Sequence, residues 1–206
     1  MKTIFKAQFL FLFIIIPFLL QASGDEWKLR KDKNEIQVFT KKREARNIYK
    51  YKVKTKIQAS VQKVYEQVID FNENLKYMEL VDSLSFLKHR KNKRYINYMR
   101  FDMPWPVTNR EMVMDMNVEI LKDRIRLVSD DLPDYVKKNK DYVQIEDFHE
   151  EWTIKENKVT DKTQIVIVGW VNPGGNIPTW IVNLFSVRTP FKFISGIVQE
   201  IKKENL

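Results

Sequence analysis

Hydrophobic residues near the end of the chain recur at steps of three and four, which is the spacing of one face of an α-helix. This face consists of Trp180, Leu184, Val187, Phe191, Ile194, Val198 and Ile201. Further apolar residues make the first half of the segment hydrophobic on nearly every side, namely Ile177, Ile181, Val182 and Phe185. Such a helix needs other elements to cover it, so we expect the rest of the chain to enclose it.

The turn ahead of this helix is rich in residues that favour abrupt changes of chain direction. Pro173 fixes its own φ, and Gly174 and Gly175 adopt positive φ without a steric clash. Pro178 suits the first helical position, where a missing N–H costs nothing, and Asn176 is the expected N-cap.

Another proline, Pro190, lies inside the predicted helix. A proline in a helix interior removes one hydrogen bond and clashes with the preceding turn, at a cost of about 3 kcal/mol. We therefore expect Pro190 to interrupt the helix. Such a break would let the part before it act as a gate while residues 191–201 stay docked.

The middle of the chain alternates between apolar and polar residues, with the period of two that half-buried strands show. Residues 110–121 are the clearest case. Their apolar positions are Met112, Met114, Met116, Val118 and Ile120, and their polar ones are Glu111, Asp115, Asn117 and Glu119. Further strands are expected at residues 27–29, 36–40, 49–57, 84–88, 95–101, 124–128, 142–155 and 163–171.

One helical region lies between these strands. Ser60 is the expected N-cap of a helix over residues 61–69, and a second short helical turn follows at residues 73–78. A helix pair, several consecutive antiparallel strands and one long terminal helix predict an α+β domain.

Length and composition favour a single domain. The chain has 206 residues, of which 44% are hydrophobic, enough for one well-packed core. Its net charge of +9 comes from 36 basic and 27 acidic residues, which are interspersed. The basic cluster at residues 88–94 is typical of a solvated hairpin tip. A nucleic-acid or anionic-membrane patch is the alternative, but no recognition motif accompanies the charge.

The N-terminus has the form of a secretory signal peptide. Lys2 and Lys6 precede an apolar run over residues 9–20, and small residues follow. We expect cleavage after residues 1–24, which leaves residues 25–206 as a periplasmic or extracellular domain. An uncleaved anchor is the alternative, although the run is too short for a membrane-spanning helix. The sequence has no cysteine, which excludes disulfides and thiolate chemistry.

Three segments together resemble the START (steroidogenic acute regulatory protein-related lipid transfer) domain family. A proline-rich loop at residues 103–109 leads into Arg110-Glu111, a Trp-x-Ile strand begins at Trp152, and an Asn-Pro-Gly-Gly turn precedes Ile-Pro-Thr-Trp at residues 177–180. Their order and spacing match the family over residues 27–201. The structural positions of this pattern are Arg110, Pro173, Gly174, Gly175 and Pro178. We expect Arg110 to hold the loop by bonding carbonyl or carboxylate groups.

The resemblance implies a helix-grip fold, in which a curved antiparallel sheet wraps the C-terminal helix around an internal hydrophobic tunnel for one lipid. The proline-rich loop and the helix would border the tunnel mouth. The candidate ligand-binding residues are Trp105, Met112, Met114, Met116, Val118, Trp152, Trp180, Ile181, Leu184, Phe185 and Arg188. The methionines would form a soft wall suited to a flexible ligand, with ordinary core packing as the alternative.

Two positions depart from the family pattern. Glu111 stands where the family usually has aspartate, which is a mild chemical change. Met116 stands where sterol-type members have a buried arginine. Because a buried charge needs a partner or a ligand hydroxyl, its absence argues against a sterol-like binding mode.

Three functions fit the sequence. The favoured one is a non-enzymatic carrier or sensor of a lipid or another hydrophobic small molecule. The second is an aromatase/cyclase-like enzyme of the same superfamily, which would need polar groups in the tunnel; Tyr142, Glu146 and Glu150 share strand parity with Trp152. The third is an interaction module that uses the basic hairpin on an anionic surface.

Catalytic and metal-binding motifs are weak. His89 lies in the basic cluster and His149 on a strand, without HExxH or paired-ligand spacing. No nucleophile elbow or phosphate-binding loop is present. We therefore expect no catalytic residue, no metal and no cofactor. The expected partner is a lipid or hydrophobic small molecule, with transient membrane contact compatible with the charge, no nucleic acid, and a monomer favoured.

Overall fold

The structure is a computed structural model that describes residues 26–43, 48–175 and 177–204. Its centre is one antiparallel sheet in the order β1-β2-β3-β10-β9-β7-β6-β5-β4, and the short β8 pairs in parallel with β6. The strands are β1 (Lys28–Lys33), β2 (Ile36–Arg43), β3 (Ile48–Ile57), β4 (Val81–Arg90), β5 (Arg94–Phe101), β6 (Arg110–Ile120), β7 (Arg124–Asp131), β8 (Val143–Gln144), β9 (Glu146–Asn157) and β10 (Lys162–Asn172).

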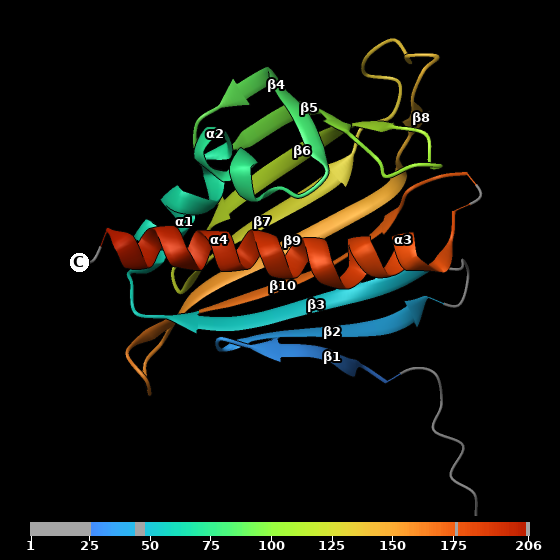
Figure 1. The fold of residues 1–206 in the computed structure, drawn as a ribbon. Helices are drawn as coiled ribbons and strands as arrows, with labels where there is room; N and C mark the ends of the chain where they lie inside the picture. The colour runs from blue at the N-terminus through green and yellow to red at the C-terminus, as the bar shows by residue number, and fades with distance from the viewer. Residues whose placement is uncertain (1–25, 44–47, 176, 205–206) are drawn as a thin grey trace, which may run out of the picture.

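The helices lie on one side of this sheet. The long C-terminal helix crosses the sheet, with α1 and α2 beside it (Figure 1). The helical segments are α1 (Val61–Ile69), α2 (Phe71–Asn74), the 3-10 turn η1 (Leu75–Tyr77), and the terminal helix of α3 (Thr179–Asn183), the π-helical η2 (Leu184–Arg188) and α4 (Thr189–Lys203). The predicted α+β, helix-grip arrangement of a sheet around a terminal helix is therefore confirmed.

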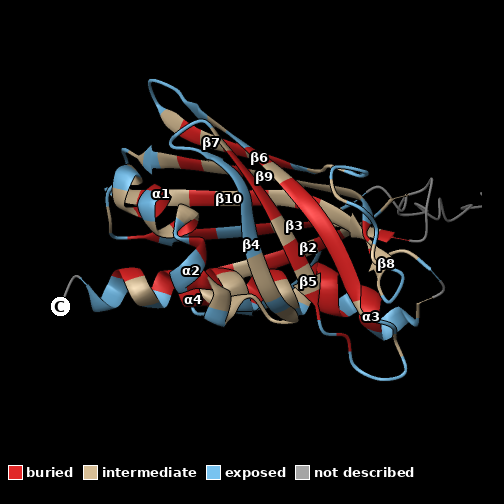
Figure 2. Ribbon diagram, turned by 90° about the horizontal axis from the view of Figure 1, so that it is seen from above, coloured by how far each residue is buried: buried red, intermediate tan, exposed pale blue. Residues whose placement is uncertain are grey.

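The core fills the space between the sheet and the terminal helix. Ile181, Ile194 and Ile201 of the helix are fully buried against strand residues such as Ile154 and Ile165. The hairpin tips and the C-terminal end of α4 are exposed (Figure 2). The sequence pattern therefore identified the face of the helix that the sheet covers.

Strand β6 follows the predicted alternation over only part of its length. Met112, Met114 and Met116 are buried on the face that looks toward the helices, but Ile120 is 58% exposed. Glu111, expected on the solvent side, is buried because the segment after β7 covers it: its Oε1 accepts from the N–H of Asn139 at 2.9 Å. The prediction of one solvent face along the whole strand is therefore wrong at its two ends.

Neither proline of the terminal helix has the role predicted from the sequence. Pro178 has extended backbone angles and is the N-cap, so the helix begins one residue later, at Thr179. Pro190 does not interrupt the helix, which runs through from Thr179 to Lys203. Instead, the π-helical turn η2 ends immediately before α4, in whose first turn Pro190 lies. The changed hydrogen-bond pattern of this π-helical turn accommodates Pro190, which has no backbone N–H to donate. Asn176, the expected cap, lies outside the described residues.

The helix pair α1–α2 is tied together by caps and one buried amide. Ser60 Oγ accepts from the N–H of Lys63 at 3.1 Å, as expected for an N-cap. Fully buried Asn74 donates to the carbonyl of Gln67 at 2.6 Å and accepts from the Gln67 side chain at 3.0 Å. These bonds fix the angle between the two helices.

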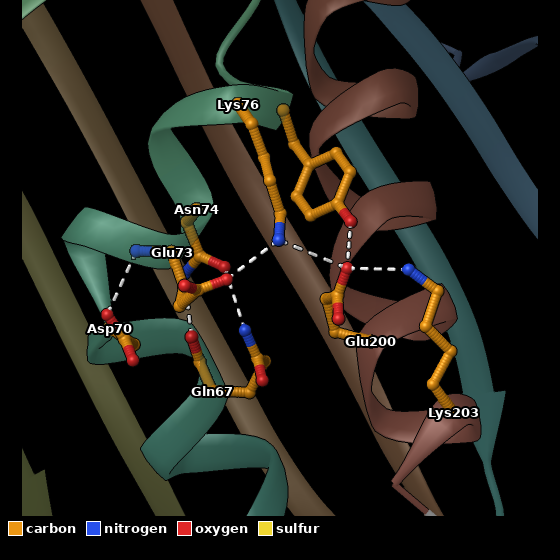
Figure 3. A network of polar contacts seen from close by, with 8 residues as sticks. Gln67, Asp70, Glu73, Asn74, Lys76, Glu200 and Lys203 are labelled. Atoms are coloured by element: carbon orange, nitrogen blue, oxygen red, sulfur yellow. Dashed lines mark hydrogen bonds and ion pairs between the residues drawn. The ribbon is translucent and has the colours of Figure 1, made fainter.

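A polar network fastens this pair to the C-terminal end of α4 (Figure 3). Glu200 accepts hydrogen bonds from the Tyr77 hydroxyl and from Lys203 Nζ, the latter at 3.0 Å. Lys76 Nζ lies 3.3 Å from the same carboxylate. The network therefore joins elements that are more than one hundred residues apart in the sequence.

The predicted signal peptide lies in residues that the structure does not describe, since the described part begins at residue 26. Cleavage and export therefore stay predictions. The domain expected from residue 25 onward is one sheet with its helices on one side.

Candidate functional site: an apolar cavity between sheet and terminal helix

A cavity of about 140 Å³ lies between the inner face of the sheet and the helices. Its wall is mainly apolar and combines strand residues with residues of α2 and the terminal helix. The apolar lining includes Phe71, Met99, Met112, Met114, Met116, Trp152, Phe185 and Phe193. Unbranched methionine side chains change shape at little cost, so this wall adapts to an apolar guest.

Besides Trp152 with its indole N–H, four lining residues carry a polar group within this apolar wall: Tyr51, Glu79, Glu150 and Thr189. Two of them form a pair. The Tyr51 hydroxyl donates to Glu150 Oε2, and the indole Nε1 of Trp152 donates to Glu150 Oε1 at 2.7 Å. Both carboxylate oxygens of Glu150 therefore have partners.

A glycine makes this pairing sterically feasible. In the sheet, Gly169 of β10 lies between Tyr51 of β3 and Glu150 of β9. A Cβ at this position would lie 2.7 Å from the Tyr51 hydroxyl oxygen and 2.6 Å from the carbonyl oxygen of His149. The tyrosine ring therefore crosses over the glycine to reach the carboxyl group, a close approach that glycine permits in a strand.

Burial raises the pKa of the Glu150 carboxyl, and the hydrogen bonds from Tyr51 and Trp152 offset only part of that effect. The pKa of Tyr51 is also raised well above its ordinary value, first by burial and then by the neighbouring Glu150. The tyrosine therefore keeps its proton and remains the donor of the pair.

Arg110 connects the proline-rich loop to the turn before the terminal helix. It is 3% exposed, and its guanidinium donates to the carbonyls of Pro173 at 3.2 Å, Gly174 at 3.1 Å and Thr108. Burial lowers its pKa. This is the loop-holding role expected for Arg110, and it places two of the three recognised segments in direct contact.

The candidate ligand-binding residues fall into two groups. Those on the cavity wall are Met112, Met114, Met116, Trp152 and Phe185. Ile181 and Leu184 are buried and Val118 is half-buried, and all three lie away from that wall. Trp105 is 90% exposed, Trp180 is 47% exposed, and Arg188 is a surface residue that pairs with Glu79. A surface groove, rather than the cavity, is lined by Trp180, Leu184 and Arg188.

Sequence reasoning named one of the four polar lining residues, Glu150. Tyr51 could have been found, because it lies on the apolar side of the alternating strand over residues 49–57. Glu146 and Trp152 do not lie on the same face of β9 as simple alternation would predict. Asp147 has φ of 59°, and the β9–β10 register shifts at this point. Glu146 is consequently exposed, and Tyr142 lies before β9 begins.

Within the described ranges, no group of three or more histidine, aspartate or glutamate side chains could hold a metal ion. His149 instead lies with its Nδ1 2.7 Å from Asp130 Oδ1 and stacks on the ring of Trp170. His89 packs against Tyr95 at the basic hairpin. Both histidines thus have local packing roles.

Several known proteins resemble this chain in sequence or in structure. Over 184 residues the chain is 27% identical to the uncharacterized protein PA1579 of Pseudomonas aeruginosa, covering 88% of this chain and 90% of that protein. It is 21% identical to the phosphatidylcholine transfer protein of Rattus norvegicus, covering 86% of this chain and 84% of that protein. The crystal structure of a STAR-related lipid transfer protein from Xanthomonas axonopodis superimposes with a TM-score of 0.75 at 26% identity, covering 86% of this chain and 99% of that one.

The resemblance seen in the sequence motifs extends over nearly the whole chain. The family model described as START domain matches residues 19–205. The matched range contains every strand and helix of the structure and the entire cavity wall. The chain therefore belongs to the START domain family, the StAR-related lipid transfer family.

Proposed function

We propose that this chain binds one lipid, or another hydrophobic small molecule, in the cavity between sheet and terminal helix and acts as a non-enzymatic carrier or sensor. The observation that carries the proposal is the methionine-rich apolar wall of that cavity. A concave apolar site with a few polar groups is the usual form of a small-molecule site. The names of two relatives, a phosphatidylcholine transfer protein and a STAR-related lipid transfer protein, support a lipid as the ligand class.

The direct test is to purify the protein from its native host and identify any bound molecule. Organic extraction followed by mass spectrometry should yield a lipid or similar apolar molecule in near-stoichiometric amount. Protein stripped of ligand should then bind an environment-sensitive fluorescent fatty probe. A stripped protein that binds no apolar probe would contradict the proposal.

Met116 offers a sharper test, because its side chain lies on the cavity wall and is 4% exposed. Met116→Arg would place a longer, charged side chain on this apolar wall, where burying the charge is opposed by several kcal/mol of desolvation, so probe affinity should fall at least about tenfold. Met116→Leu keeps the volume and should cost less than about 1.5 kcal/mol of unfolding free energy. Thermal melts separate lost binding from lost folding. If the Met116→Arg protein folds and binds the probe with parental affinity, the ligand does not lie against this wall.

One observation favours an enzymatic alternative. Glu150 is a buried carboxyl with a raised pKa on the cavity wall, as general acids often are. Its two oxygens are engaged by Tyr51 and Trp152, so a substrate would have to displace one of these donors. For a carrier, the extracted ligand should have the same mass before and after incubation with stripped protein. If the mass of the ligand changes on incubation with the parent protein but not with the Glu150→Gln variant, the protein is an enzyme that depends on Glu150.

We also propose that the chain is exported, because the charged and apolar pattern of residues 1–24 is typical of a signal peptide. Intact mass of the protein from its native host should correspond to a start near residue 25. Retention of residues 1–20 would contradict cleavage, and recovery of the protein only from the cytoplasmic fraction would contradict export.

A further inference from the structure

Two polar atoms on the cavity wall have no hydrogen-bond partner among the described residues. They are Oε2 of Glu79 and Oγ1 of Thr189, and both are shielded from solvent. Most buried polar groups in proteins have at least one partner, and an unpartnered one is costly. Glu79 follows η1 and Thr189 begins α4, so the two atoms approach the cavity from different elements.

Glu79 stands between the cavity and the outside. It lines the cavity, and it also lines the surface groove that includes Pro104 and Trp180. On the outer side, Glu79 Oε1 lies 2.6 Å from Arg188 Nη2 and 2.8 Å from Lys192 Nζ. One carboxylate oxygen is therefore held by two cations, while the other, Oε2, is shielded from solvent and has no partner among the described residues.

Thr189 lies between those two cationic residues in the terminal helix. A hydroxyl in a helix usually bonds to the carbonyl four residues earlier, and two serines of this helix do so. Ser186 Oγ donates to the Val182 carbonyl at 2.6 Å, and Ser195 Oγ to the Phe191 carbonyl at 2.7 Å. Thr189 makes no such bond within the described part of the chain. Its hydroxyl is therefore available to a guest.

We propose that Glu79 and Thr189 together bind a hydroxyl group at the polar end of a neutral apolar ligand. The hydroxyl hydrogen would be donated to Glu79 Oε2, and the hydroxyl oxygen would accept from Thr189 Oγ1. This inference rests on the proposed lipid-binding function and names the chemistry of the group that the cavity selects.

The local charges favour a neutral donor over other polar groups. Arg188 and Lys192 outnumber the single carboxylate of Glu79, which disfavours a cationic ligand. A ligand carboxylate has no hydrogen to donate to the unpartnered oxygen of Glu79, because an ionised carboxylate only accepts. An ether or ester oxygen offers no hydrogen to a carboxylate, which only accepts. An alcohol satisfies both unpartnered atoms.

The test compares three ligands of equal chain length on stripped protein: 1-decanol, 1-methoxydecane and decanoate. Each displaces an environment-sensitive fluorescent fatty methyl ester. Decanol should displace it at about tenfold lower concentration than methoxydecane, the effect of one or two hydrogen bonds. Decanoate should be weaker than decanol. Equal potency of decanol and methoxydecane, or a stronger effect of decanoate, would overturn the inference.

Thr189→Val removes only the hydroxyl and keeps the side-chain shape, so the advantage of decanol should fall from about tenfold to about threefold or less. Ser195→Ala is the matched control, because it deletes a hydroxyl of the same helix that already bonds a carbonyl; it should leave the ratio unchanged. An unchanged ratio in Thr189→Val, with a parental melt, would overturn the inference. Absence of probe binding in the parent would overturn the proposed function as well, whereas equal binding of alcohol and ether would overturn this inference alone.

Discussion

The two halves of the terminal helix are held in different ways. Beyond Pro190, the helix packs on the helix pair and carries the Glu200 network at its end (Figure 3). A glycine, Gly196, lies directly under the ring of Tyr77, where a Cβ would overlap the ring atoms. Before Pro190, the helix includes the π-helical turn η2 and an N-cap without a side-chain hydrogen bond.

The two halves therefore differ in how they are held, although both line the cavity, the first through Phe185 and the second through Thr189 and Phe193. The half from Thr189 onward is anchored by packing and polar contacts to η1, which fixes the helix on the sheet. The half before it borders both the cavity, through Phe185, and the surface groove, through Trp180. A helix held by such contacts at one end can stay folded while the π-helical turn beside the cavity adjusts.

The largest expected effect comes from breaking the anchored half. Gly196→Ala should destabilise the protein by about 2 kcal/mol, because a Cβ that overlaps the Tyr77 ring outweighs the roughly 1 kcal/mol gained in helix propensity. Urea unfolding measures the change. In a Tyr77→Ala background the same substitution should be neutral or stabilising. A destabilisation that persists in that background would show that Gly196 matters for another reason.

The next effect concerns the turn that leads into the first half of the terminal helix. Arg110→Lys should cost about 2 kcal/mol of unfolding free energy, because one ammonium cannot reproduce the fork that serves the carbonyls of Thr108, Pro173 and Gly174. Arg126→Lys is the control, since this arginine pairs with Glu119 and Glu151 at the partly exposed side of the sheet. Equal losses in the two variants would argue against a special role for the Arg110 fork.

Hydrogen exchange tests the comparison without any mutation. Backbone amides of residues 181–188 should exchange at least about tenfold faster than those of residues 192–201, since the first group includes the π-helical turn and the second includes Glu200, whose network ties α4 to η1. Binding of an apolar ligand should slow the first group more than the second. Uniform protection along residues 181–201 would mean that the helix opens as a single unit.

The smallest expected effect is a pH dependence of the stability that the Glu200 network contributes. Hydrogen bonds from Tyr77 and Lys203 lower the pKa of Glu200 from 4.5 to about 2. Ionised Glu200 therefore contributes stability that is fully present above about pH 4.5 and is lost as the pH falls toward 2. Glu200→Gln should lower the melting temperature at pH 7, and the difference should shrink through this window. Glu156→Gln, at an exposed position, should show no such trend, and a pH-independent difference for Glu200→Gln would contradict the shift.

Much of the fold was predictable because its elements have strong periodicity. The alternation at Met112, Met114 and Met116 and the helical spacing from Leu184 to Ile201 identified the buried faces, because each pattern is repeated several times, whereas Trp180 is 47% exposed. The resemblance around Arg110 predicted a loop held through carbonyl or carboxylate groups, and its guanidinium bonds three carbonyls.

The features that escaped prediction depend on neighbours distant in sequence. Glu111 looks like a solvent residue until the segment carrying Asn139 covers it. The bulge at Asp147 reverses the parity on which Glu146 was assigned to the face of Glu150. Pro190 has the chemistry of a helix breaker, but a π-helical turn accommodates it within a continuous helix. None of these outcomes follows from local propensity alone.

The open sheet ends at two edge strands, β1 and β4, and both carry basic residues. These edges carry Lys28, Arg30, Lys31 and Lys33 on β1, and Lys88 and Arg90 on β4. Both strands also contain register shifts that interrupt the regular ladder. Cations and bulges hinder a second chain from adding its own strand to an exposed edge. The cations of the basic hairpin tip would thus oppose edge-to-edge pairing of the open sheet, an effect that requires no anionic partner.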